Sequence, residues 1–150
     1  KYNCRIMVDQ AHCFGVLGPN GLGICEKYNL LRETDIIMGT FSKICGAIGG
    51  FATGSVEMVE WLRAFSRAHV FSVSLPPSTV AAVSKSLDIF LKDDYLIKKL
   101  HSNIQYFVKN LESIGYSFNG THESAVVPVV VGDEKKLGED LGVQEDKLPL

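Results

Sequence analysis

The sequence predicts an α/β fold. Short runs of β-type apolar residues, over residues 5–8 and 35–38, are each followed by a glycine-rich stretch. Longer segments carry apolar residues at helical spacing, over residues 56–69, 78–91 and 94–114. Such elements are typical of a mainly parallel sheet flanked by helices. We therefore expect one such sheet, with ligand-binding residues in the loops at its carboxyl edge.

The first half of the chain is expected to place an aspartate at the carboxyl end of a strand. Residues 5–8 form that strand and Asp9 follows it, where ligands sit in parallel sheets. Four glycines over residues 15–23 predict a flexible surface loop, because they lack the order of a dinucleotide-binding loop. A short helix over residues 25–31 and a strand over residues 35–38 should follow.

The second half is expected to be mostly helical. Ser55 should cap the helix over residues 56–69, and the apolar stripe of that helix, which includes Trp61 and Phe65, is interpreted as core packing. The remaining predicted elements are strands over residues 51–54 and 70–74, helices over residues 78–91 and 94–114, and strands over residues 116–119 and 126–131.

A single lysine stands out among small and apolar residues. Lys43 is the only charged residue over positions 36–56, so we expect its ammonium to be desolvated, which makes lysine a usable nucleophile and base. Thr40 and Ser42, with backbone N–H groups freed by nearby glycines, can cradle a phosphate. The segment is not a Walker loop, because Ile44 follows the lysine. A lysine beside a phosphate cradle indicates a Schiff-base cofactor, whereas the alternative is a solvated loop lysine.

Three ordered blocks carry a family resemblance. They are VDQAHCFGVLGPNGLG over residues 8–23, TFSK with the later Gly-Gly pair over residues 40–50, and FSVSLPP over residues 71–77. Together they resemble the pyridoxal-phosphate (PLP) α-oxoamine synthases, and the similarity runs to Asp133. The resemblance implies part of the large domain of a fold-type-I PLP transferase over residues 1–110. It also implies the incomplete beginning of a small α+β domain over residues 111–150.

The resemblance assigns roles to five residues of one chain. Asp9 pairs with the protonated pyridine nitrogen of PLP, and His12 bonds its phenolic oxygen. Thr40, assisted by Ser42, binds the phosphate, and Lys43 forms the Schiff base. From the residues alone, an Asx turn or helix cap that closes the strand is the favoured interpretation of Asp9, and a lone histidine such as His12 is usually structural.

Two further positions bear on the site. By resemblance, Ser72 and the adjacent Val73 backbone reach the phosphate of the neighbouring subunit's cofactor, which implies a homodimer with shared active sites. Taken alone, Ser72 is an ordinary strand hydroxyl. Gln10 departs from the acidic residue common at its place in the family, and we expect little consequence because that position does not contact the ring.

The activity implied is a PLP-dependent decarboxylative condensation of an amino acid with an acyl-CoA. Phe41 and Phe51 favour a serine palmitoyltransferase of sphingolipid biosynthesis, which would make a 3-keto sphingoid base. Residues 18–21 resemble 8-amino-7-oxononanoate synthase of biotin biosynthesis instead, and glycine C-acetyltransferase is a further alternative. A non-catalytic subunit and an unrelated fold-type-I aminotransferase or lyase remain open.

Composition excludes several partners and sites. The net charge of −2 gives no electrostatic footprint for nucleic acid, and no apolar run indicates membrane association. The four cysteines lack metal-ligand spacing, so we expect reduced thiols of a cytoplasmic protein and no metal site. Because the chain begins at Lys1 and has no arginine after Arg67, we expect a fragment that is inactive and binds the cofactor poorly on its own.

Overall fold

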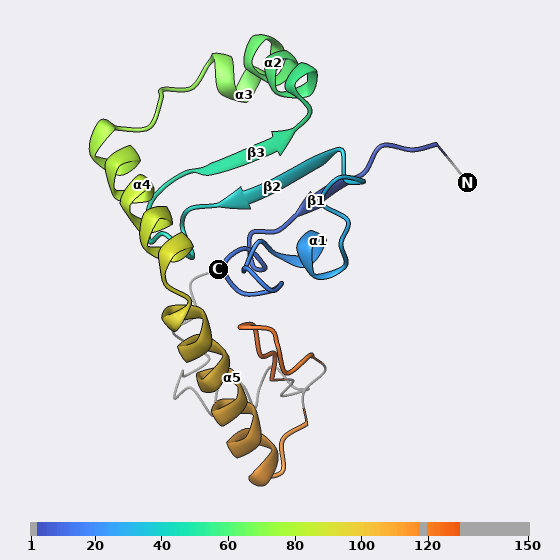
Figure 1. The fold of residues 1–150 in the computed structure, drawn as a ribbon, viewed down its shortest axis with the longest axis vertical. Coiled ribbons are helices and arrows are strands. Elements are labelled where there is room, and N and C mark those ends of the chain that lie inside the picture. Colours follow the sequence, from blue (N-terminus) through green and yellow to red (C-terminus); the bar gives the residue numbers. More distant parts are fainter. Residues whose placement is uncertain (1–2, 118–119, 130–150) are drawn as a thin grey trace, which may run out of the picture.

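The computed structural model describes residues 3–117 and 120–129 and contains a three-stranded mixed sheet. The strands are β1 (Met7–Asp9), β2 (Ile36–Thr40) and β3 (Gly50–Gly54), in the order β1-β2-β3 (Figure 1). β1 runs parallel to β2 and β3 antiparallel to it. The described strands are therefore mixed rather than mainly parallel, because the chain returns directly from β2 into β3 through one loop.

Five helices accompany the sheet among the described residues. They are α1 (Ile24–Lys27), α2 (Val56–Phe65), α3 (Arg67–Val70), α4 (Pro77–Lys92) and α5 (Tyr95–Ser113). Helices α4 and α5 confirm the predicted elements closely. Helix α5 ends before Gly115, whose φ of +91° is a conformation that glycine adopts without strain. It runs through position 110, so the proposed division into residues 1–110 and 111–150 stays a prediction.

The helix expected over residues 56–69 is confirmed at its start and broken near its end. The Ser55 hydroxyl accepts a hydrogen bond from the Met58 N–H at 3.3 Å, as an N-cap should. Ser66 has extended backbone angles and separates α2 from α3. The interpretation of the apolar stripe as core was wrong for Trp61 and Phe65, which are 57% and 65% exposed. Periodicity predicts an apolar face of a helix, but not whether anything covers that face.

Three predicted strands are not found where the structure describes the chain. Residues 71–76 are irregular, although a strand was expected over residues 70–74, and residues 116–117 and 126–129 are irregular too. The rest of the last two predictions lies outside the described residues. A strand needs a neighbour to satisfy its backbone groups, and no described strand runs beside these segments.

The arrangement brings strand ends and helices to one edge of the sheet. Because β1 and β2 are parallel, their carboxyl ends lie at the same edge, and the arrowhead of β2 points toward α4 in Figure 1. The buried hydrophobic side chains are distributed over β2, α1, α4 and α5: Ile37, Cys25, Val83, Ile104 and Val108. No helix among the described residues has the length and apolar character needed to cross a bilayer.

Candidate functional site

A tight turn after β1 carries two of the predicted site residues. The Asp9 Oδ1 atom accepts a hydrogen bond from the Ala11 N–H at 2.8 Å, which is an Asx turn. The Gln10 carbonyl accepts from the N–H groups of Cys13 and Phe14, both at 2.9 Å. The Asx turn uses only Oδ1, and Oδ2 has no hydrogen-bond partner among the described residues. Asp9 can therefore close the turn with one oxygen and still offer the other to a ligand.

A closed loop after β2 carries Lys43. The Phe41 N–H donates to the Gly49 carbonyl at 2.9 Å and closes the base of the loop. The Thr40 hydroxyl donates to the same carbonyl at 3.1 Å. It lies 2.8 Å from the Ser42 hydroxyl and accepts from the Ser42 N–H at 3.2 Å. Two hydroxyl groups therefore lie side by side at the carboxyl end of β2, close to the turn of Asp9.

One pocket brings His12 and Lys43 together. It has a volume of about 500 Å³, and both side chains line it together with Ser86 and mostly apolar side chains from α4, α5 and residues 125–126. Thr40 and Asp9 do not line this pocket, but end the two parallel strands at the same edge of the sheet. Lys43 is exposed, so the expectation of a desolvated ammonium was wrong for this structure. The small and apolar residues next to Lys43 in sequence do not bury its side chain, because the loop exposes it to solvent.

Ser72 and Val73 lie away from the pocket of their own chain. They belong to the irregular segment that joins α3 to α4, and neither lines the pocket. Ser72 is exposed, and 99% of Val73 is exposed. The structure therefore does not bring these two residues to the site formed by Asp9, His12, Thr40 and Lys43.

Four phenylalanine rings pack against one another beside the candidate site, and the sequence did not predict this cluster. The ring of Phe14 packs against Phe51 and Phe90, with ring centroids 5.2 and 5.6 Å apart, and Phe41 lies 5.6 Å from Phe51. A Cβ atom on Gly39 would lie 2.5 Å from the Phe51 ring, so glycine is needed there. The rings join the His12 turn, the Lys43 loop, β3 and α4. Their wide separation in sequence left no local signal of this cluster.

The glycine-rich segment is a packed loop, and the expectation of a flexible surface loop was wrong. The Gly15 N–H donates to the Gly21 carbonyl at 2.7 Å, and the Gly23 N–H donates to the Leu17 carbonyl at 2.8 Å. All three glycines have positive φ, and Gly15, Gly21 and Gly23 are buried. Glycine here allows close approach of backbone segments rather than mobility.

Glu26 of α1 holds the same loop through its carboxylate. Its oxygens accept from the Asn20 side chain at 2.7 Å, from the Asn20 N–H at 3.1 Å and from the Leu22 N–H at 2.9 Å. Partial burial raises the pKa of Glu26, but these hydrogen bonds outweigh that effect and leave the pKa below its ordinary value. The carboxylate therefore stabilises the loop above its ordinary pKa, and that contribution is lost as the pH falls through the lowered value.

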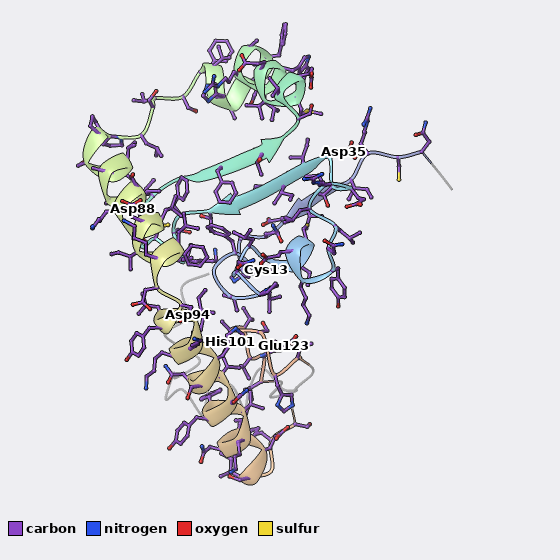
Figure 2. The ribbon with its side chains drawn as sticks, in the orientation of Figure 1. Cys13, Asp35, Asp88, Asp94, His101 and Glu123 are labelled. Atoms are coloured by element: carbon purple, nitrogen blue, oxygen red, sulfur yellow. The ribbon has the colours of Figure 1, made fainter. Side chains whose placement is uncertain are left out.

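Helix α5 contacts the glycine-rich loop, and the segment around Glu123 contacts α1. The His101 ring nitrogen Nε2 lies 2.8 Å from the Val16 carbonyl, and Lys27 forms an ion pair with Glu123. Figure 2 shows His101 and Glu123 next to one another, whereas Asp35 lies at the end of β2 that is remote from α4. These contacts join the loop before α1 to the C-terminal part of the described chain.

The cysteines are free thiols. Cys4, Cys13, Cys25 and Cys45 form no disulfide, as expected from their spacing. Partial burial, with smaller contributions from Asp9 and Cys25, raises the pKa of the Cys13 thiol. Among residues 3–117 and 120–129 there is no group of three or more His, Cys, Asp or Glu side chains placed to hold a metal ion.

Comparisons with known proteins agree with this arrangement. The sequence profile of the family "Aminotransferase class I and II" matches residues 1–147. The 8-amino-7-oxononanoate synthase of Petrotoga mobilis is 42% identical over 139 residues, which are 93% of this chain and 35% of that protein. The serine palmitoyltransferase of Bacteroides thetaiotaomicron is 38% identical over 136 residues, covering 91% of this chain and 34% of that protein.

Solved structures show the same fold. A serine palmitoyltransferase from S. paucimobilis with bound PLP and myriocin matches with a TM-score of 0.84 and 32% identity, over 89% of this chain and 35% of that chain. An 8-amino-7-oxononanoate synthase from Francisella tularensis has a TM-score of 0.78 at 23% identity, over 91% of this chain and 42% of that chain, and supports the fold alone.

The chain spans about a third of the length of the two curated relatives. Both are α-oxoamine synthases, so the resemblance read from the three sequence blocks is confirmed. The α/β fold class is confirmed by the structural matches. By its sequence profile over residues 1–147, and by the fold it shares with these enzymes, the chain belongs to the aminotransferase class I and II family.

Proposed function

We propose that the whole protein carrying this chain is a PLP-dependent acyltransferase that condenses an amino acid with an acyl-CoA thioester and releases carbon dioxide and CoA. The observation that carries the proposal is the pocket lined by both His12 and Lys43, at the sheet edge where Asp9 and Thr40 end neighbouring parallel strands. An amine, an imidazole, a carboxylate and a hydroxyl therefore lie at one edge of the sheet. This set of groups fits a phosphorylated pyridine aldehyde.

Each group has a chemical match on PLP. The free Oδ2 atom of Asp9 would hold a proton on the ring nitrogen, and the His12 ring would donate to the phenolic oxygen. The Ser42 hydroxyl, which is exposed, would donate to the phosphate, and the Thr40 hydroxyl would do so by exchanging its hydrogen bond to the Gly49 carbonyl for one to the phosphate. Lys43 Nζ would hold the cofactor at its aldehyde carbon, whose oxygen would leave as water. The exposed position of Lys43 is compatible with this, because the amine must exchange with a substrate amine.

The chain's own residues would then move the substrate proton. When bound, PLP withdraws electrons from the α-carbon of the amino acid. Lys43, released by the incoming amino acid, would take the α-proton on Nζ. Asp9 would keep its negative charge beside the ring nitrogen and thereby hold the proton there. The apolar wall of the pocket would exclude water from the carbon that attacks the thioester.

We further propose that Ser72 and the Val73 backbone complete the site of a second copy in a homodimer. Their exposure and their distance from the pocket of their own chain support this, since they are available to another subunit. The Phe71 side chain beside them is 81% exposed. Sedimentation of the whole protein should give a dimer, and a monomer with full activity would contradict the shared site.

For the substrates we rank serine and a long-chain acyl-CoA first, which would give a 3-keto sphingoid base. Phe41 and Phe51 favour this reading, and the mostly apolar pocket beside Lys43 supports it. The relative from Petrotoga mobilis supports 8-amino-7-oxononanoate synthase as the second candidate, and glycine C-acetyltransferase is the third.

A substrate panel tests this assignment. The purified whole protein, loaded with PLP, is given serine, glycine or alanine with long or short acyl-CoA thioesters, and release of CoA thiol is followed. Serine with a long chain should react fastest. Fastest reaction of alanine or glycine with short chains would replace the first candidate by the others. Amino-group transfer without acyl-CoA would contradict the acyltransferase proposal, and no reaction together with no PLP binding would indicate a non-catalytic subunit.

Asp9→Asn should separate the effect of the negative charge of this residue from its role in the Asx turn. The Asn oxygen can still accept from the Ala11 N–H, so the Asx turn and the thermal midpoint should be retained. Loss of the charge beside the ring nitrogen should lower turnover by about tenfold to a hundredfold or more, as expected for a hydrogen bond to a charged group. Asp88→Asn, an exposed change on α4, is the matched control. Turnover of Asp9→Asn equal to that of the control would remove Asp9 from the site.

A further inference from the structure

Gln10 is the one buried polar side chain among the described residues, with 2% of its surface exposed. It stands between Asp9 and His12 in sequence. Its N–H donates to the Met38 carbonyl of β2 at 2.8 Å, and its carbonyl forms the turn described above. Its backbone therefore already ties the turn of Asp9 and His12 to the sheet.

The Gln10 side chain ties the same turn to a second element. Its Oε1 atom accepts from the Cys25 N–H at 2.9 Å, at the start of α1. Its Nε2 atom donates to the Leu22 carbonyl at 3.3 Å, at the end of the glycine-rich loop. A Cβ atom on Gly23 would lie 2.2 Å from Oε1, so the backbone at Gly23 is shaped around this amide.

The amide satisfies both neighbours, whereas an ionised carboxylate would not. The Cys25 N–H requires an acceptor and the Leu22 carbonyl requires a donor, and a glutamine side chain supplies one of each. A carboxylate of the same size would meet the Leu22 carbonyl with an oxygen that carries no hydrogen. In a buried place that repulsion and the missing hydrogen bond are costly. In this chain, the amide of Gln10 therefore matches both of its buried neighbours.

We propose that Gln10 is a positioning residue, whose amide joins the glycine-rich loop and α1 to the turn of Asp9 and His12 and so holds that turn in its cofactor-binding conformation. This inference rests on the proposed function, because it concerns the residues assigned there to PLP. Gln10 itself touches no reacting atom. It acts through the conformation of its neighbours.

The test compares Gln10→Glu with Gln10→Met in the whole protein. Burial and the facing Leu22 carbonyl should raise the pKa of the introduced carboxyl above its ordinary value. Below that pKa the neutral carboxyl carries a hydrogen and can donate to Leu22, and above it the donor is lost. Gln10→Glu should therefore bind PLP nearly as tightly as wild type at about pH 5.5, and about tenfold to a hundredfold more weakly at about pH 8.5. Gln10→Met can make neither bond and should be weak at both pH values.

The wild type measured at each pH is the reference, because other titratable groups lie on the segments around Gln10. The titratable side chains on the segments in contact with Gln10 are Asp9, His12 and Cys13 of its own turn and Cys25, Glu26 and Lys27 of α1, and β2 contributes none. All of them are present in every variant. The ratio of variant to wild-type affinity therefore reports the introduced carboxyl.

A second measurement on cofactor-free protein keeps the two proposals apart. Hydrogen exchange of the Cys13 and Phe14 amides, which donate to the Gln10 carbonyl, should be faster in Gln10→Met at both pH values and in Gln10→Glu only at high pH. An affinity ratio that does not change with pH, with affinity equal to wild type in both variants, would overturn the positioning role. If the wild type binds no PLP, the proposed function fails. The role of Gln10 is then tested by hydrogen exchange alone, and unchanged protection of the two amides in both variants would overturn it.

Discussion

Lys43→Ala should abolish the absorption band of lysine-bound PLP in the whole protein and lower turnover by about 10²- to 10⁴-fold, the usual contribution of a group that transfers the substrate proton. The structure gives a reason to expect no effect on folding. Lys43 is an exposed side chain on a loop closed by other residues, namely through the Phe41 N–H and the Gly49 carbonyl. Absorbance titration with PLP and a thermal unfolding curve measure both effects on the same sample.

Lys109→Ala is the matched control for this experiment. Lys109 is an exposed lysine of α5 that does not line the pocket, so its removal changes the net charge equally and should leave the band intact. Retention of the band in Lys43→Ala would move the Schiff base to another lysine and contradict the assignment. Loss of the band in both variants would mean that net charge, and not the amine of Lys43, controls PLP binding.

Gly23→Ala should cause the largest loss of stability among simple substitutions near the site. Gly23 has φ +100° and ψ −166°, a region that is essentially restricted to glycine. Holding an alanine in this conformation costs about 1–3 kcal/mol. The added methyl group would also overlap Gln10 Oε1 at 2.2 Å, and overpacking of this kind costs about 1–3 kcal/mol more. The free energy of unfolding should fall by about 2–6 kcal/mol, as measured by urea denaturation.

Gly115→Ala separates the two contributions. Gly115 has φ +91°, but nothing lies within 4 Å of the position of an added Cβ atom, so this variant meets only the backbone cost. Combining Gly23→Ala with Gln10→Ala should cost less than the sum of the two single changes, because the overlapping amide is then absent. A loss in Gly23→Ala no greater than that in Gly115→Ala would show that the loop accommodates the methyl group and does not depend on the fit around Gln10.

The helices were predictable because their signals are local. Ser55 and the apolar spacing after it located the start of α2, and Gly115 located the end of α5. Lys43 stood out by its isolation, and the family resemblance assigned roles to Asp9, His12 and Thr40, which stay predictions. The strand expected over residues 70–74 failed for the opposite reason, since β-type residues form a strand only beside a neighbour.

The sequence by itself determined the family, the α/β class and the residue types available for chemistry, because each of these is encoded in residues close together along the chain. Only the tertiary structure decided which of those residues meet. It brought His12 and Lys43 into one pocket and left Ser72 outside it. It also decided the role of Gln10, whose partners Leu22 and Cys25 are 12 and 15 residues away. The partners of a buried amide are fixed by how distant segments pack, and no local pattern contains that information.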